Sequence, residues 1–173
     1  MYYCDLIILG ESKRDISIKL SGVHWVLHGY MRKSGVNIPL DFPNYSLADK
    51  PYKKTLGNTI RLFANEQSTL RDCLMQIGQN EFVCENIATM LAQIKPVDFK
   101  KVSGYVVLKK ARCSKNSKFY DDLKTKADLL PQIVYKSGQF LHIKREVVDA
   151  GKNTGVTSYG LSSRLNSTYL PVF

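Results

Sequence analysis

Hydrophobic residues in the first half of the chain recur with periods that switch between those of a strand and a helix. The run Tyr2–Leu9 is rich in β-branched and aromatic residues and predicts a strand. Apolar residues three and four apart then predict a helix that Asp15 caps and that ends near Ser34, before Gly35. Its expected buried stripe is Ile16, Leu20, Val23, Leu27 and Met31.

The next segments alternate in the same way. Strands are predicted over Val36–Phe42 and Thr59–Ala64, and a second helix begins after a Ser68 cap. The first of these strands would bury Val36, Ile38, Leu40 and Phe42, and the helix Leu70, Leu74 and Ile77. Phe82–Ile94 fits either a helix or a strand. The order strand, helix, strand, strand, helix and a last uncertain strand is that of a ferredoxin-like, or RRM-like, domain.

A change in composition near Val97 divides the chain. We expect a ferredoxin-like domain over residues 1–97 and a β-rich, basic domain over residues 98–173, so the fold class is α+β. The second part contains strand patterns at Ser103–Lys110 and Gln139–Val148 and a short helix pattern at Phe119–Leu130. Thr154–Leu161 fits a strand or a glycine loop.

Positive charge is concentrated in one short stretch. The chain has 25 Lys and Arg against 15 Asp and Glu, a net charge of +10 at pH 7. Lys100–Lys126 holds nine Lys and Arg residues and two Asp residues, and so accounts for seven of the ten net charges. A solvated basic face is the common cause of a charge run. This degree of concentration favours a nucleic acid instead, because neutralised phosphates release condensed counterions. A membrane surface is a weaker competitor, since the stretch is not cleanly amphipathic.

The four cysteines, at positions 4, 73, 84 and 113, form no C-x-x-C pair and no zinc-ligand spacing. We therefore expect free thiols in a reducing cytoplasm, no bound metal and no cofactor, although a dispersed metal site stays open. No run approaches the roughly 18 apolar residues of a membrane span. Met1–Gly10 carries Asp5 and lacks a basic n-region, so it does not predict a signal peptide.

Four motifs, in the same order and with similar spacing, resemble the type I-F CRISPR repeat endoribonucleases. The segment Gly155–Ser162 and the tail Leu170–Phe173 are similar to that family's Tyr-Gly-Leu-Ser segment and proline-aromatic end. Ser137–Phe140 resembles its Ser/Thr-Gly-Gln segment. Val26–Tyr30, followed by Ile38–Pro43, resembles its helical histidine and the strand after it. The resemblance covers nearly the whole chain, with small gaps.

One departure from the family concerns its long arginine-rich helix, which inserts into the RNA major groove. Here the corresponding interval is short and carries Lys118, Lys124 and Lys126 in place of an arginine cluster. Lysine is a point charge without the bidentate fork of arginine. A reduced variant of the family is therefore expected, with a weaker grip on the groove or with other contacts that compensate.

Three histidines are available for proton transfer: His24, His28 and His142. Histidine suits this work because its ordinary pKa lies near ~6.5. The pattern alone favours a half-buried pair, His24 and His28, packed against Trp25 and Tyr30. The resemblance selects His28 as the catalytic base, with His24 as the fallback. His142 has at most a structural or RNA-contacting role.

Three residues further along the chain complete the expected site. The resemblance implies that Ser137 holds the 2′-hydroxyl. Tyr159 would orient the histidine or the scissile phosphate, and the glycines around it suggest close approach by a ligand, although a core tyrosine is also reasonable. Phe140 would stack on the base beside the cut, with core packing as the equal alternative.

Alternation places Lys110, Arg112 and Ser114 on one strand face. Arg112 is the expected base-edge contact, because a bidentate guanidinium on guanine is the commonest specific pairing. We expect phosphate contacts from three further lysines: Lys109, Lys115 and Lys118.

The resemblance implies a metal-independent endoribonuclease that cleaves the repeat stem-loop of precursor crRNA at its 3′ base and leaves a 2′,3′-cyclic phosphate. It also implies that the protein stays bound to the mature crRNA with the other subunits of a type I-F surveillance complex. Two alternatives stay open. One is a catalytically weak hairpin-binding subunit of that complex, and the other is a basic nucleic-acid-binding protein outside CRISPR.

Overall fold

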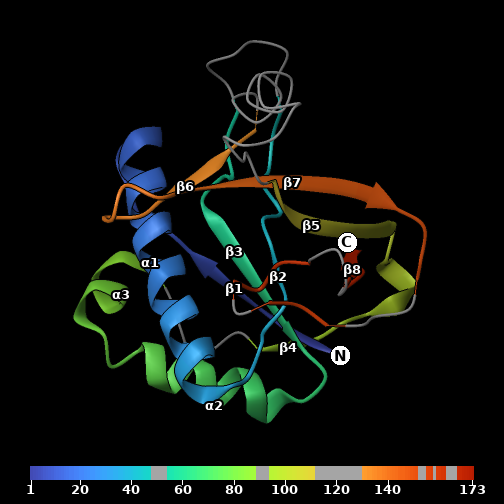
Figure 1. Cartoon of the computed structure of the whole chain (residues 1–173). Coiled ribbons are helices and arrows are strands. Elements are labelled where there is room, and N and C mark those ends of the chain that lie inside the picture. The colour runs from blue at the N-terminus through green and yellow to red at the C-terminus, as the bar shows by residue number, and fades with distance from the viewer. Residues whose placement is uncertain (48–53, 89–93, 112–129, 152–154, 158, 163–166) are drawn as a thin grey trace.

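The fold is α+β, and its described residues form two four-stranded antiparallel sheets and three α-helices (Figure 1). The computed structural model describes residues 1–47, 54–88, 94–111, 130–151, 155–157, 159–162 and 167–173. The first sheet has the order β2-β3-β1-β4, which is the ferredoxin-like arrangement. Its strands are β1 (Tyr2–Ile7), β2 (Leu40–Asp41), β3 (Thr59–Ala64) and β4 (Lys95–Pro96).

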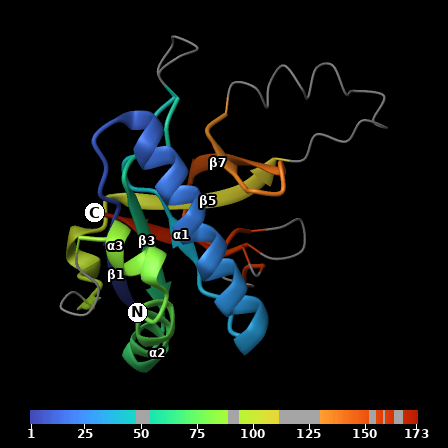
Figure 2. The same ribbon diagram turned by 90° about the vertical axis from the view of Figure 1, so that its left-hand side faces the viewer.

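The first sheet packs with three helices, which also contact one another: α1 (Lys13–Ser34), α2 (Gln67–Ile77) and α3 (Glu81–Asn86) (Figure 2). The second sheet has the order β6-β7-β5-β8 and follows the 3₁₀ turn Phe99–Lys101. Its strands are β5 (Gly104–Ala111), β6 (Gln132–Val134), β7 (Phe140–Val148) and β8 (Leu170–Val172). β6 lies beside α1, where the amide of Val134 donates to the Ser21 hydroxyl at 3.1 Å.

The long helix α1 confirms the predicted apolar stripe. Leu20, Val23, Leu27 and Met31 are buried, and Ile16 is partly buried against them. The predicted cap was wrong, because the Ser12 hydroxyl accepts from the Asp15 amide and Asp15 lies inside the first turn. Gly35 ends the helix in the left-handed region, with φ at +73°, as glycine at this position commonly does.

The predicted strand at Val36–Phe42 is much shorter in the structure. Only Leu40 and Asp41 pair with β3, and Val36 is exposed. Ile38, Leu40 and Phe42 are buried as predicted. The alternation therefore located the buried positions but not the extent of hydrogen bonding.

The remaining elements match the sequence patterns unevenly. β1, β3, β5 and β7 lie where strands were predicted. Helix α2 begins two residues earlier than a Ser68 cap predicts, and Glu66 is its cap residue. The ambiguous segment after Phe82 begins within α3. The helix predicted at Phe119–Leu130 lies almost entirely outside the described residues. In the Thr154–Leu161 segment, the described residues form a turn that ends at Leu161.

One hydrophobic cluster runs through both sheets. It contains Cys4, Leu27 and Leu62 from the first half and Val106, Ile143 and Leu170 from the second. The strands of each sheet nevertheless come from one side of Val97 only. The division into domains 1–97 and 98–173 stays a prediction.

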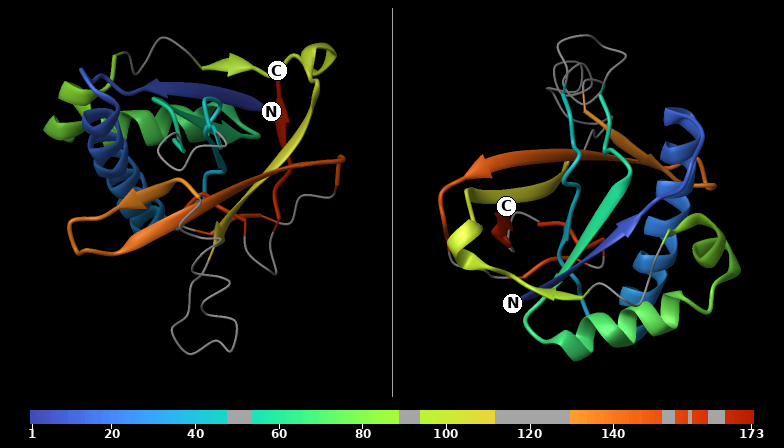
Figure 3. Two further views of the ribbon diagram at one scale, coloured as in Figure 1. Left: turned by 90° about the horizontal axis from the view of Figure 1, so that it is seen from above. Right: turned by 180° about the vertical axis from the view of Figure 1, so that it is seen from behind.

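Two arginines make bidentate ion pairs, one between the two sheets and one beside the two chain ends. Arg145 of β7 donates two hydrogen bonds, of 2.9 and 3.1 Å, to the carboxylate of buried Asp41 in β2. Arg61 of β3 pairs in the same bidentate way with Asp5 and packs over the rings of Tyr3 and Phe173. The C terminus therefore lies beside the N-terminal strand, as Figure 3 shows.

The described cysteines Cys4, Cys73 and Cys84 are free thiols, and Cys113 lies outside the described residues. Burial raises the pKa of Cys4 to about 11 and that of Cys73 to about 12, so both thiols stay protonated at neutral pH. Within the described part of the chain, no helix is long and apolar enough to cross a bilayer.

Asp41→Ala should destabilise the fold strongly, because it leaves the Arg145 guanidinium largely buried without its carboxylate. A broken buried pair costs roughly 3–5 kcal/mol in the free energy of unfolding, measured by urea denaturation. Lys101→Ala is the matched control, since its pair with Asp98 is exposed and should leave the midpoint unchanged. Equal midpoints for the two variants would show that the Asp41–Arg145 pair does not join the sheets energetically.

Candidate active site

Helix α1 presents three neighbouring side chains, His24, Trp25 and His28, to elements of the second half. His24 and His28 lie one turn apart, so both project from the same side of the helix. Tyr135, which follows β6, and Tyr159, in the turn before Leu161, pack against them. Five aromatic side chains from three parts of the chain thus form one cluster.

His24 is a fully buried bridge between these parts. Its Nε2 lies 3.2 Å from the backbone oxygen of Tyr159, and its Nδ1 lies 3.0 Å from the phenol oxygen of Tyr135. Burial, together with the charge of His28, lowers the pKa of His24 to about 4, against the weaker raising effect of the Tyr159 carbonyl. The ring is therefore neutral at pH 7.

The hydrogen-bond partners fix the tautomer of His24. A carbonyl oxygen only accepts, so Nε2 carries the proton and donates it to Tyr159. Nδ1 then accepts from the Tyr135 hydroxyl, whose pKa is raised by burial so that the phenol stays protonated. With both ring nitrogens engaged inside the protein, His24 positions Tyr135 and Tyr159.

His28 lies face to face with Tyr159. Their ring centroids are 4.0 Å apart with an interplanar angle of 10°, and the indole of Trp25 approaches the imidazole at 5.7 Å. His28 is only 5% exposed, so it is more deeply buried than the half-buried histidine that the sequence pattern predicted. The rings of Tyr159 and Trp25 therefore cover part of this imidazole.

Tyr159 belongs to a tight turn that Gly160 makes possible. Gly160 has φ at +71°, and a Cβ there would lie 2.2 Å from Leu40 Cγ and 2.7 Å from the Ile38 oxygen. Its own oxygen accepts from the Leu40 amide at 3.0 Å. At Gly160 the close backbone approach is therefore made by the chain's own Leu40 segment, and the expected approach of a ligand to this turn stays a prediction.

Lys110 of strand β5 contacts the aromatic cluster. Its ammonium lies 5.0 Å from the centre of the Tyr159 ring, a cation–π distance. The neighbouring Lys109 points to another partner, with its ammonium 2.8 Å from Glu146. Hydrogen bonds from Lys109 and Lys144 lower the pKa of Glu146 and keep it ionised. The two adjacent lysines are thus placed in different surroundings.

Ser137 lies in the turn between β6 and β7, and Phe140 is the first residue of β7. Both are exposed, and no interaction that the structure describes joins Ser137 to His28. Phe140 pairs in register with Val134 on the solvent side, while Ile133 and Leu141 face the core. Four predicted RNA contacts lie outside the described residues: Arg112, Ser114, Lys115 and Lys118.

Trp25 and Tyr135 are members of the cluster that the sequence patterns did not identify as functional. Trp25 lies three residues before His28, a spacing that brings helical side chains together, so the pattern could have included it. Tyr135 has no such local signal, because its partner His24 is 111 residues away in the chain.

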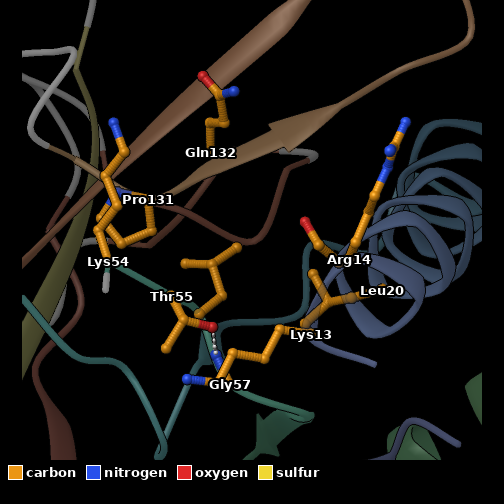
Figure 4. Close-up of a pocket in the computed structure, with 10 residues that line it drawn as sticks. Lys13, Arg14, Leu20, Lys54, Thr55, Gly57, Pro131 and Gln132 are labelled. Carbon is orange, nitrogen blue, oxygen red and sulfur yellow. Dashed lines mark hydrogen bonds between the residues drawn. The ribbon is translucent and has the colours of Figure 1, made fainter. Parts of the chain in front are cut away.

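A basic pocket opens beside the first turn of α1. Its volume is about 240 Å³, and its lining includes Lys13, Arg14, Lys54 and Gln132 (Figure 4). None of the ion pairs between described residues involves these three cations. By the rise of α1, this pocket lies roughly 12 Å from His28, measured from Leu20, the last of its lining residues on the helix. Across the described chain, no group of three or more His, Cys, Asp or Glu residues is placed to hold a metal ion.

Comparison with protein families finds a match to the family described as CRISPR-associated protein (Cas_Csy4), over residues 3–127. The chain belongs to this family. Cas_Csy4 proteins are the CRISPR repeat-processing endoribonucleases of type I-F systems, so the protein is a CRISPR-associated ribonuclease of crRNA processing. A search of curated proteins finds no match.

The Cas_Csy4 match includes His28 and all predicted lysine and arginine contacts, up to Lys118. Ser137, Phe140 and Tyr159 lie beyond its end at residue 127. Family membership decides against a nucleic-acid-binding protein outside CRISPR. The roles of the individual site residues stay predictions.

Gly160→Ala should destabilise the protein and displace Tyr159 from His28. The backbone strain alone costs roughly 1–3 kcal/mol, and the contacts with Leu40 and Ile38 add to it. Gly35→Ala is the control, because Gly35 has nearly the same φ, +73°, with no atom within 4 Å of the added Cβ. Thermal denaturation should show a larger loss for Gly160→Ala. Equal losses would mean that the turn does not press against β2.

The stability of the protein should fall as the pH drops from 6.5 to about 4. In this range an unfolded histidine binds a proton that folded His24 excludes, so the free energy of unfolding declines by up to ~1.4 kcal/mol per pH unit. Urea denaturation at several pH values measures the slope. His24→Phe removes this titration, so its slope should be shallower, whatever its absolute stability. Parallel slopes would contradict the buried, neutral state of His24.

Proposed function

We propose that this protein is a metal-independent endoribonuclease that cuts the repeat stem-loop of precursor crRNA at its 3′ base. The observation that carries this proposal is the face-to-face stack of His28 on Tyr159, with the Lys110 ammonium beside it. A single imidazole stacked on a tyrosine ring that also contacts a lysine ammonium suits base-promoted attack on a phosphodiester.

The proposed reaction needs no atom from outside the RNA. His28 removes the proton of the 2′-hydroxyl, whose oxygen attacks the adjacent phosphorus as the bond to the leaving 5′-oxygen breaks. A proton is returned to that oxygen, which gives a 2′,3′-cyclic phosphate and a 5′-hydroxyl. Tyr159 holds the imidazole through their stacked faces, and Ser137 would hold the attacking ribose.

In this proposal, the protein binds RNA through basic side chains of β5 and the residues after it, and through the basic pocket beside α1. Lys110 supports a phosphate contact near the cut, and the pocket with Lys13, Arg14 and Lys54 supports a second one away from it. Arg112 would read a base edge, Phe140 would stack on a base, and Ser114, Lys109, Lys115 and Lys118 would add contacts. The protein would then stay on the mature crRNA among the other subunits of a type I-F surveillance complex.

The burial of His28 favours a second candidate function. The His28 side chain is only 5% exposed, so a ribose hydroxyl can reach its imidazole only if the neighbouring side chains move. The same protein could therefore act chiefly as a hairpin-binding structural subunit with weak cleavage. The two functions differ in rate and share the RNA ligand.

Single-turnover cleavage of repeat RNA in EDTA separates these candidates. The wild type should cut at the 3′ base of the stem and leave a cyclic phosphate, while His28→Ala should lose at least ~100-fold in rate, the lower end of a general base contribution. His142→Ala serves as the control for loss of another histidine and should cleave normally.

RNA affinity is measured in parallel by filter binding. Tight binding without cleavage by the wild type would favour the structural subunit. Undiminished cutting by His28→Ala would refute the catalytic assignment.

A further inference from the structure

Trp25 is a half-exposed indole at the edge of the candidate active site. It is 52% exposed, although it packs against Tyr135 at 5.0 Å and His28 at 5.7 Å between ring centroids. Both contacts are tilted by 55°, so neither neighbour covers the indole face by parallel stacking. A broad apolar surface thus faces solvent next to a nearly buried histidine.

Packing does not account for this exposure. Leu20, Val23, Leu27 and Met31 already form the buried stripe of α1, and Trp25 lies outside it. An apolar residue that only sealed the cluster would gain more from burial than from remaining half in water. Exposed aromatic side chains in nucleic-acid-binding proteins instead serve as stacking surfaces for unpaired bases.

Other exposed aromatic residues do not share this position. Phe99 and Phe140 are similarly exposed, but among the described ring contacts only Trp25 and Tyr159 touch His28. Tyr159 stacks face to face on His28, whereas Trp25 keeps exposed surface. Trp25 is therefore the aromatic group best placed to meet a base whose ribose approaches that imidazole.

We propose that Trp25 is a stacking platform for one of the two nucleobases that flank the scissile phosphate, separate from the base contact expected of Phe140. The proposal rests on the proposed function, since it requires the cut RNA strand to reach His28. Stacking on the indole fixes the nucleotide at the edge of the cluster and directs its ribose towards the imidazole. Trp25 is then a substrate-positioning residue.

The chain itself supplies the probe, because Trp25 is its only tryptophan. Repeat RNA with a 2′-deoxy nucleotide before the cut binds without reacting, and its stacked base should quench the emission of Trp25. An abasic site at the nucleotide on one side of the cut should abolish the quenching, and its position identifies the base. Unchanged emission at saturating RNA, with binding verified by anisotropy, would overturn the proposal.

Cleavage kinetics give an independent test through a double-mutant cycle. Trp25→Ala should lower the single-turnover efficiency by about 5- to 150-fold, the range expected for one lost base stack, and Trp25→Phe should restore most of it. On abasic RNA the wild type should be equally slow, and Trp25→Ala should cause no further loss. Additive losses would show that Trp25 supports the fold and does not hold the base.

Met75→Ala is the matched control, because Met75 is an exposed apolar residue on another helix, α2, and its loss should leave cleavage unchanged. The fluorescence result does not depend on catalysis. If wild-type protein binds RNA and is quenched but does not cut, the platform holds and the proposed endonuclease fails. If it cuts without quenching, the endonuclease holds and the platform fails.

Discussion

The hydrogen bonds of buried His24 hold the candidate site together. Its two ring nitrogens join α1 to Tyr135 after β6 and to the turn that carries Tyr159. Burial lowers the pKa of His24 to about 4 and keeps the ring neutral, so that Nε2 donates to the Tyr159 carbonyl and Nδ1 accepts from the Tyr135 hydroxyl. The stack of Tyr159 on His28 therefore depends on a histidine that takes no part in the proposed chemistry.

Other contacts place this bridge by fixing the two sheets to each other. The bidentate pair of Arg145 with Asp41 joins β7 to β2, and Gly160 joins the Tyr159 turn to the same β2 segment through the Leu40 amide. The short strand β2 thus receives contacts from two separate parts of the second half. Through these contacts, β2 helps to fix the Tyr159 turn, and with it the ring that stacks on His28, relative to the second sheet.

Burial has opposite consequences for the two histidines of α1. For His24 it enforces one tautomer and a fixed set of partners. For His28 it limits the approach of a substrate, and the surrounding rings decide how much of the imidazole an RNA strand can reach. In the proposed function, the aromatic surfaces around His28 would position the RNA strand by stacking on its bases.

The sequence by itself determined the order of the longer strands and helices, the apolar face of α1 and the concentration of charge after Lys100, because these depend on local periodicity and composition. The short strands β6 and β8 were not predicted, and the segment of α3 was left open between a helix and a strand. The sequence also placed His24 and His28 one turn apart. That spacing alone could not separate their roles, and only the family resemblance selected His28. The partners that distinguish His24, Tyr135 and Tyr159, lie 111 and 135 residues from it along the chain. Only the packing of the second sheet against α1 brings these groups together, and no local pattern encodes a contact over that separation.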